Sequence, residues 1–187
     1  PDVSIFYPYR TGDFKSSTSN AVVIYMPRNG CLRILDPARG DKQTYARLDA
    51  VLTNAIPLSD PSRIITETGE PATPMFFSEP AHEWCYYFTK AQLAQQQGNF
   101  EQVVSLAREA IARKFEPQDQ NEWLVFIDGY ARVGDFQTAG ELSKAALAQD
   151  ERIRRGVCIA WKQVQAESGE GSESQIEEIM RQIDCNP

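Results

Sequence analysis

Histidine is almost absent from this sequence of 187 residues, in which His82 is the only one. A metal site with several histidine ligands is therefore excluded, and a Ser-His-Asp or Cys-His catalytic site would have to use His82. That residue follows a proline-rich stretch at the expected start of a helix, where capping or packing is its ordinary role. The sequence thus predicts no metal, no cofactor and no catalytic constellation.

The sequence also lacks a long apolar run and a basic face. No apolar stretch approaches the roughly 20 residues that cross a bilayer, so membrane insertion by this chain is not expected. The net charge is −7, with 8 basic and 9 acidic residues in 1–80 against 11 and 17 in 81–187. Nucleic acid is excluded as a partner, because phosphate neutralisation needs a basic face. Arg152, Arg154 and Arg155 are interpreted as a solvated helix start rather than a phosphate patch.

The four cysteines show no C-x-x-C spacing, which disfavours a zinc knuckle or a thioredoxin-like redox pair. Their even number permits two disulfides in an oxidising compartment, and four free thiols in the cytosol are the alternative. Cys158 and Cys185 fall on expected antiparallel helices, where they could face one another. Cys85 begins the helical region and could pair with Cys31. These two pairs are the disulfide candidates.

Residues 1–66 have the pattern of a small α+β unit. Short β-branched and aromatic runs bounded by turn residues predict four strands, at residues 4–9, 21–26, 31–36 and 63–66. The turn sequence at 27–30 joins the second and third of these as a hairpin. Apolar residues at three- and four-residue steps from 45 to 56 predict a helix of about three turns. Residues 67–80 hold three prolines and are predicted to be a linker.

The polar stretch 11–18, which lies within the aromatic-flanked run 7–20, is predicted to be a loop between two strands. It resembles a phosphate loop only faintly, because the first glycine of that motif is missing. Loops on rigid scaffolds often carry binding. The candidate binding residues of this unit are therefore Tyr9, Arg10, Asp13 and Lys15.

The second half, residues 81–187, contains an internal echo: 97–110 and 133–146 align with Gly98 over Gly134, thirty-six residues apart. Each unit is predicted to be a helix, a tight turn and a second helix. Glycine ends the first helix, and the following Asn99 or Asp135 caps the next. A third helix pair is expected at 152–167 and 173–184.

This pattern resembles the tetratricopeptide repeat, whose usual period is near 34 residues. The match is good around the turn and departs from the family's Leu-Gly pair at Lys90-Ala91 and Phe126-Ile127. The resemblance implies an all-α array of about three helical hairpins, so the whole chain is predicted to be α+β. It also implies that the first helix of each pair lines a concave groove. The matching groove candidates are Phe88, Gln92, Gln95, Gln96, Leu124, Asp128 and Arg132.

A wider resemblance spans nearly the whole chain, carried by the phrases at 7–14, 19–37, 56–64 and 79–94. They look like the soluble C-terminal region of predicted bacterial multi-pass membrane proteins of the glycosyltransferase type, similar to dolichyl-phosphate-mannose mannosyltransferases. The resemblance implies an extracytoplasmic domain tethered through a membrane-spanning parent. The family's catalytic portion has no counterpart here, so no catalytic residue carries over.

The sequence therefore predicts a non-catalytic protein-interaction domain, whose partner is a protein, a peptide or another part of the parent chain. An accessory domain that binds the acceptor or the sugar of a membrane glycosyltransferase is the alternative. Occupation of the groove by the chain's own first unit, and a cytoplasmic location, are the ordinary alternatives. The sequence does not identify the partner or the oligomeric state.

Overall fold

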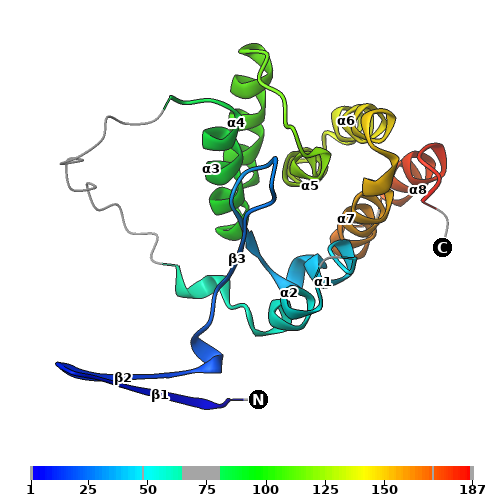
Figure 1. Ribbon diagram of the computed structural model, residues 1–187. Coiled ribbons are helices and arrows are strands. Elements are labelled where there is room, and N and C mark those ends of the chain that lie inside the picture. The colour runs from blue at the N-terminus through cyan, green and yellow to red at the C-terminus, as the bar shows by residue number, and fades with distance from the viewer. Residues whose placement is uncertain (1, 48, 65–80, 170, 186–187) are drawn as a thin grey trace.

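The computed structural model describes residues 2–47, 49–64, 81–169 and 171–185, and it is an α+β protein. Two small antiparallel sheets of two strands each come first, and an array of helices follows (Figure 1). The expected linker at 67–80 lies outside the described residues. No helix in the described ranges is both long and apolar enough to cross a membrane.

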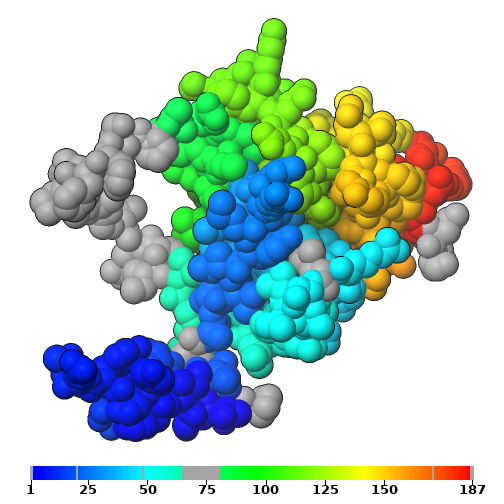
Figure 2. Space-filling model, in the orientation of Figure 1, coloured from blue at the N-terminus to red at the C-terminus, as the bar shows by residue number. Residues whose placement is uncertain are grey.

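The first sheet is a hairpin of β1 (Ser4–Tyr9) and β2 (Gly12–Ser17), in which Tyr7 lies opposite Phe14. The prediction of a loop at 11–18 was therefore wrong, because residues 12–17 form a strand. Only a two-residue turn, Arg10 and Thr11, separates this strand from β1. The hairpin stands as a separate lobe beside the body of the protein (Figure 2).

The second sheet pairs β3 (Val23–Tyr25) with β4 (Arg33–Leu35), which confirms the predicted hairpin. The strand expected at 63–66 is wrong at its start, because Pro61–Arg63 is a 3-10 helix. The Asp60 side chain accepts the backbone N–H of Ser62 at 3.2 Å and so stabilises that turn. Residues 65 and 66 lie outside the described part.

A single three-turn helix over 45–56 was also wrongly predicted. The structure has a short helix α1 (Asp41–Thr44) and a separate helix α2 (Ala50–Ala55). The Asp49 side chain accepts the N–H of Val51 at 2.6 Å, which starts α2 anew. Tyr45 instead closes α1 and places its hydroxyl on a buried guanidinium described below.

The array consists of three antiparallel helix pairs in chain order, and the expected third pair is present. The helices are α3 (Trp84–Gln96), α4 (Phe100–Ala112), α5 (Trp123–Arg132), α6 (Phe136–Gln149), α7 (Arg154–Glu167) and α8 (Glu173–Gln182). Their inner faces form one continuous core that includes Phe126, Trp161 and Ile176.

The turns of the first two pairs use the same chemistry, as their sequences predicted. Gly98 and Gly134 adopt φ values of 71° and 83°, which residues with a side chain rarely adopt. These two glycines therefore end the preceding helices. The Asn99 side chain then accepts the N–H of Gln102, and Asp135 makes the equivalent bond, each at 3.1 Å. These caps satisfy backbone donors that a helix start leaves without partners.

Close approach of α4 and α5 depends on Gly129, because a Cβ atom there would lie 2.4 Å from the Val103 side chain. Ala94, Ala107 and Ala110 are buried in the same region. Small side chains thus let the backbones of neighbouring helical hairpins approach closely.

Candidate functional site

The concave side of the array is filled by the chain's own first unit. β4 contacts α3, and α1 lies beside α7 (Figure 1). The cavity left at this contact measures about 70 Å³, whereas small-molecule sites span roughly 300–1,000 Å³. It has room for a few water molecules and none for a peptide or a sugar.

The sequence-predicted groove residues are mostly brought together, but as walls of this cavity. Those that line it are Phe88, Gln92, Gln95, Gln96, Leu124 and Asp128. Arg132 is not among them and instead pairs with Asp128. From the first unit, Asp36, Arg39, Asp41 and Tyr45 line the opposite side, and sequence reasoning had not placed any of these four here.

Arg39 reaches from the first unit to two of the groove candidates, Gln95 and Asp128. Its Nη2 donates to the backbone carbonyl of Gln95 at 2.6 Å, and its Nη1 lies 3.3 Å from a carboxylate oxygen of Asp128. The Gln95 amide donates to the same oxygen at 2.6 Å. Two groove candidates are thus already engaged by an arginine of the same chain.

Arg132 joins two helix pairs. Its Nε donates to Asp128 at 3.0 Å, and its Nη2 donates to Glu167 of α7 at 3.1 Å. The hydrogen bond that Arg132 donates to Glu167 is the main reason that the pKa of Arg132 is raised, and the same bond lowers the pKa of Glu167. Because its charge is shared in this way, Arg132 connects α5 to α7.

A half-buried acid, Asp41, lies at the edge of the cavity. Burial raises the pKa of Asp41 from 3.8 to about 6, although the carboxylate accepts the backbone N–H of Asp36 at 2.6 Å. The charge of Asp36 raises the pKa further, while Arg39 and Arg33 lower it. Asp41 therefore titrates in a range where most carboxyl groups are already ionised.

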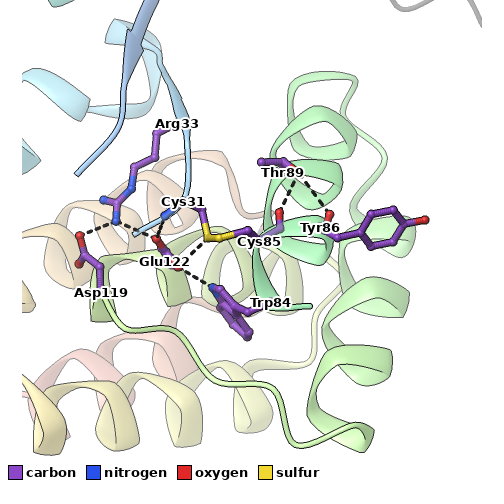
Figure 3. The surroundings of a disulfide bond; sticks show 8 residues. All are labelled: Cys31, Arg33, Trp84, Cys85, Tyr86, Thr89, Asp119 and Glu122. Atoms are coloured by element: carbon purple, nitrogen blue, oxygen red, sulfur yellow. Dashed lines mark hydrogen bonds and ion pairs between the residues drawn. A yellow bond between two sulfur atoms is a disulfide. The ribbon is translucent and has the colours of Figure 1, made fainter. Parts of the chain in front are cut away.

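The second cluster surrounds Glu122, whose side chain is fully buried (Figure 3). Its carboxylate accepts the backbone N–H of Cys31 at 2.6 Å and the indole N–H of Trp84 at 2.5 Å. Arg33 lies 3.3 Å from the same carboxylate. The Cys31 sulfur is near as well, but a disulfide sulfur has no proton to donate. Three segments far apart in sequence thus meet at one side chain.

Arg33 is the counter-charge and is itself only 1% exposed. Its guanidinium donates to Asp119 at 2.5 Å and to the hydroxyl of Tyr45 at 2.7 Å. Burial acts to lower the pKa of Arg33, but the oxygens of Tyr45, Asp119 and Glu122 outweigh it and leave the pKa raised. The charge of Arg33 is balanced within the cluster, although its Nε is buried without a hydrogen-bond partner among the described residues. We interpret the cluster as structural.

Two disulfides are present, Cys31–Cys85 and Cys158–Cys185, which are the two pairs that the sequence offered. The first connects the first unit to the start of α3, next to Glu122 (Figure 3). The second connects α7 to the residues that follow α8. The described chain has no free cysteine.

The four loop candidates lie on the hairpin and do not converge. Tyr9 belongs to β1, Arg10 to the turn, and Asp13 and Lys15 to β2, where they lie opposite Pro8 and Phe6. Because side chains alternate across a strand, Asp13 and Lys15 point to one face and Tyr9 to the other. No pocket is built from these four residues.

The face that carries Tyr9 is instead aromatic. By the strand register, Ile5, Tyr7 and Phe14 lie on it as well. Their exposed fractions are 42%, 59% and 50%, and that of Tyr9 is 63%. The Tyr7 and Tyr9 rings lie 5.0 Å apart between centroids. Sequence reasoning had named only Tyr9, although the alternation of 5, 7 and 9 was the available signal.

His82 stacks on Tyr86, with 3.7 Å between ring centroids. That contact agrees with a packing role at the start of the helical region. Among the described residues, no group of three histidine, cysteine, aspartate or glutamate side chains is placed to hold a metal ion.

No known protein-family model matches the chain, and comparison with curated proteins and with solved structures finds no similar one. The functional argument therefore depends on the geometry alone.

Asp41 makes the stability of this protein depend on pH. Its folded-state pKa of about 6 exceeds the ordinary 3.8, so its stabilising contribution is complete below pH 3.8 and lost as the pH rises through 6. Between pH 3.8 and pH 6 the wild-type protein should lose about 2–3 kcal/mol of unfolding free energy through Asp41. In Asp41→Asn, whose carbonyl oxygen can still accept the Asp36 N–H, this pH-dependent loss should disappear. Urea unfolding at several pH values measures it. Asp13→Asn, which removes an exposed hairpin carboxylate, is the control, and an unchanged slope in Asp41→Asn would contradict the prediction.

The Glu122 cluster predicts a large effect of breaking one charge pair. Glu122→Ala leaves a buried guanidinium short of one partner and leaves the N–H groups of Cys31 and Trp84 unsatisfied. The free energy of unfolding should therefore fall by about 3–5 kcal/mol. The double variant Arg33→Leu/Glu122→Leu removes both charges and should lose less than the sum of the single Leu variants. Urea unfolding of the four proteins gives the comparison. Additive losses would show that the two charges are not coupled.

Proposed function

We propose that this chain is a non-catalytic interaction domain that binds a protein, or another part of its own parent chain, through the aromatic face of the hairpin. That face consists of Ile5, Tyr7, Tyr9 and Phe14 on β1 and β2. The observation that carries the proposal is the exposure of these four side chains, 42% to 63%, on one side of a projecting sheet.

The size of this face supports the proposal. Tyrosine and phenylalanine bury about 150–250 Å² each when covered, so the exposed parts of the four side chains amount to on the order of 400 Å². Soluble monomers rarely expose larger contiguous apolar patches, and patches of this size are often functional. A two-stranded hairpin is also marginal by itself in water, so a covering partner would stabilise it.

The geometry favours docking of the face over addition of a strand at an edge. Pro8 lies in β1 and has no N–H to donate, which weakens that edge for pairing. Lys15 and Asp13 put charges into β2, and charged side chains discourage edge-to-edge pairing. A partner would therefore bind to the aromatic side chains of the face rather than to a strand edge, and tyrosine is enriched at protein interfaces.

The array then serves as the support for this surface. We propose that it is a tetratricopeptide-like array, since the first two of its three antiparallel helix pairs share a glycine turn followed by a capping residue. Its concave side does not serve as the binding groove in this proposal, because Arg39 and its neighbours fill it. The scaffold is thereby held rigid while the hairpin projects.

The proposed location is extracytoplasmic, in the soluble part of a membrane-tethered parent. The two disulfides support it, because such bonds persist in oxidising compartments and are rare in the cytosol.

The alternative is an accessory domain that binds a sugar on the same face. The neighbouring rings of Tyr7 and Tyr9 offer a platform for the apolar side of a pyranose, and Arg10 in the adjoining turn supplies donors for its hydroxyl groups. This reading uses the same aromatic surface with a different partner.

The docking surface is tested by site-specific photo-crosslinking in cells that make the whole protein. A photoreactive residue in place of Tyr7 should give one discrete adduct, and the adduct should disappear when Tyr9→Ser and Phe14→Ser are added. Lys15, on the opposite face, and Gln92, in the filled cavity, are the matched control positions. If the crosslinked product has the mass of the whole protein with no added partner, the residue at position 7 has reacted with another part of the same protein.

Absence of an adduct at Tyr7, or equal adducts at the control positions, argues against the proposed face. The sugar alternative is tested separately by NMR titration of the purified domain with neutral oligosaccharides. Saturable shifts confined to the tyrosine-bearing strand would favour it.

Location is tested by trapping thiols with a cysteine-alkylating reagent at the moment of cell lysis. If the protein works in an oxidising compartment, none of its four cysteines should be alkylated before reduction, and all four afterwards. Alkylation of all four without reduction would place the protein in a reducing compartment.

A further inference from the structure

A pocket of about 420 Å³ lies where the segment after α1 meets the beginning of α7. Four arginines line it, Arg47 from the first unit and Arg152, Arg154 and Arg155 from the array, together with the carboxylates of Glu151 and Asp184. Its volume falls within the range of small-molecule sites. It is distinct from the filled groove and from the hairpin.

Two of these arginines are already neutralised. Arg152 donates from Nε and Nη2 to both carboxylate oxygens of Asp150, at 2.8 and 2.9 Å. Arg154 pairs in the same two-pronged way with Glu151, and its remaining Nη1 donates to the carbonyl of Ile183. These two guanidinium groups therefore have little capacity left for a ligand.

The other two arginines, Arg47 and Arg155, keep the capacity to bind a ligand. Within the described residues, Arg47 and Arg155 make no ion pair, hydrogen bond or ring contact, and both are exposed. Two guanidinium groups with all their donors available thus line one pocket, in a protein whose net charge is −7. Like charges repel, so this arrangement has a cost that an anion would remove.

Arg155 is also badly placed for its own helix. It lies in the first turn of α7, and the partial positive charge at a helix start disfavours a cation there. Arg154 has Glu151 as compensation, but Arg155 has no such partner. Helix stability therefore gives no reason for an arginine at position 155.

A guanidinium fork can bind either a carboxylate or a phosphate through two hydrogen bonds. A carboxylate has two oxygens and is satisfied by one fork. The phosphate of a phosphomonoester has three terminal oxygens, so a second fork can bind it as well. Two available forks in one pocket therefore fit a phosphate group better.

We propose that the pocket binds the phosphate group of a phosphomonoester through Arg47 and Arg155. Arg152 and Arg154, held by their acidic partners, form the rest of its wall. The disulfide Cys158–Cys185 fixes that wall, because Cys158 lines the pocket and joins α7 to the segment beside Asp184. The proposal stands independently of the hairpin surface.

The test is an NMR titration of the whole, oxidised chain with phenyl phosphate. We expect saturable shifts of the backbone amides at 43–47 and 151–158. Arg47→Ala and Arg155→Ala should each weaken the affinity at least about tenfold, because each removes charge-assisted hydrogen bonds. Both side chains are exposed and have no described partner, so both variants should keep the wild-type spectrum elsewhere.

Arg10→Ala is the matched control, since it removes an exposed arginine from the hairpin, far from the pocket. Phenyl phosphate binding that Arg10→Ala weakens as much as Arg155→Ala would reflect net charge alone and overturn the proposal. The absence of saturable shifts would overturn it too, as would equal binding of acetate.

Co-sedimentation with vesicles distinguishes a soluble ligand from a lipid headgroup. Binding to phosphatidylcholine vesicles that contain phosphatidic acid, but not to pure phosphatidylcholine, supports a headgroup when Arg155→Ala abolishes it. If vesicles do not bind while phenyl phosphate does, a soluble phosphate compound is supported.

Discussion

A charge can be buried in a protein only when its hydrogen bonds are nearly complete, and the contact between the two parts of this chain is built around such a charge. Glu122 accepts from Cys31 and Trp84 and lies against Arg33. A segment near the N-terminus, the first helix of the array and the approach to α5 are thereby fixed at one point. The close fit also explains Gly30, where a Cβ atom would lie 2.7 Å from the Glu122 carboxylate.

That fixed point decides what the concave side of the array is used for. With β4 held under Glu122, the following residues run along the inner face, and Arg39 reaches Asp128 and Gln95. An array that would otherwise offer a groove becomes a closed, two-layered body. Two surfaces that stay open are peripheral: the hairpin at one end and the arginine-lined pocket beside α7.

Local sequence signals predicted the array well, because each of its turns depends on neighbours in the chain. Glycine, a capping Asn99 or Asp135, and small buried residues determine a helical hairpin wherever they occur. The first unit was harder, because its helix at 45–56 had the right apolar spacing but Asp49 supplied a new cap in the middle. A tertiary contact, with Tyr45 under Arg33, also outweighed the periodic pattern.

The site was predictable only in part, since the residues that fill the groove are distant in sequence from those that form it. Arg33 shares strand parity with buried Cys31 and Leu35, which was a usable sign of a buried charge, but nothing local pointed to Glu122 as its partner.

The surroundings of Glu122 also affect how the Cys31–Cys85 disulfide reacts. Cys85 is exposed and Cys31 is buried, so an incoming thiolate reaches the Cys85 sulfur and must expel Cys31. The departing thiolate would form against the Glu122 carboxylate, and the repulsion between the two negative charges slows the exchange. The bond is thus protected kinetically, by the choice of which sulfur leaves.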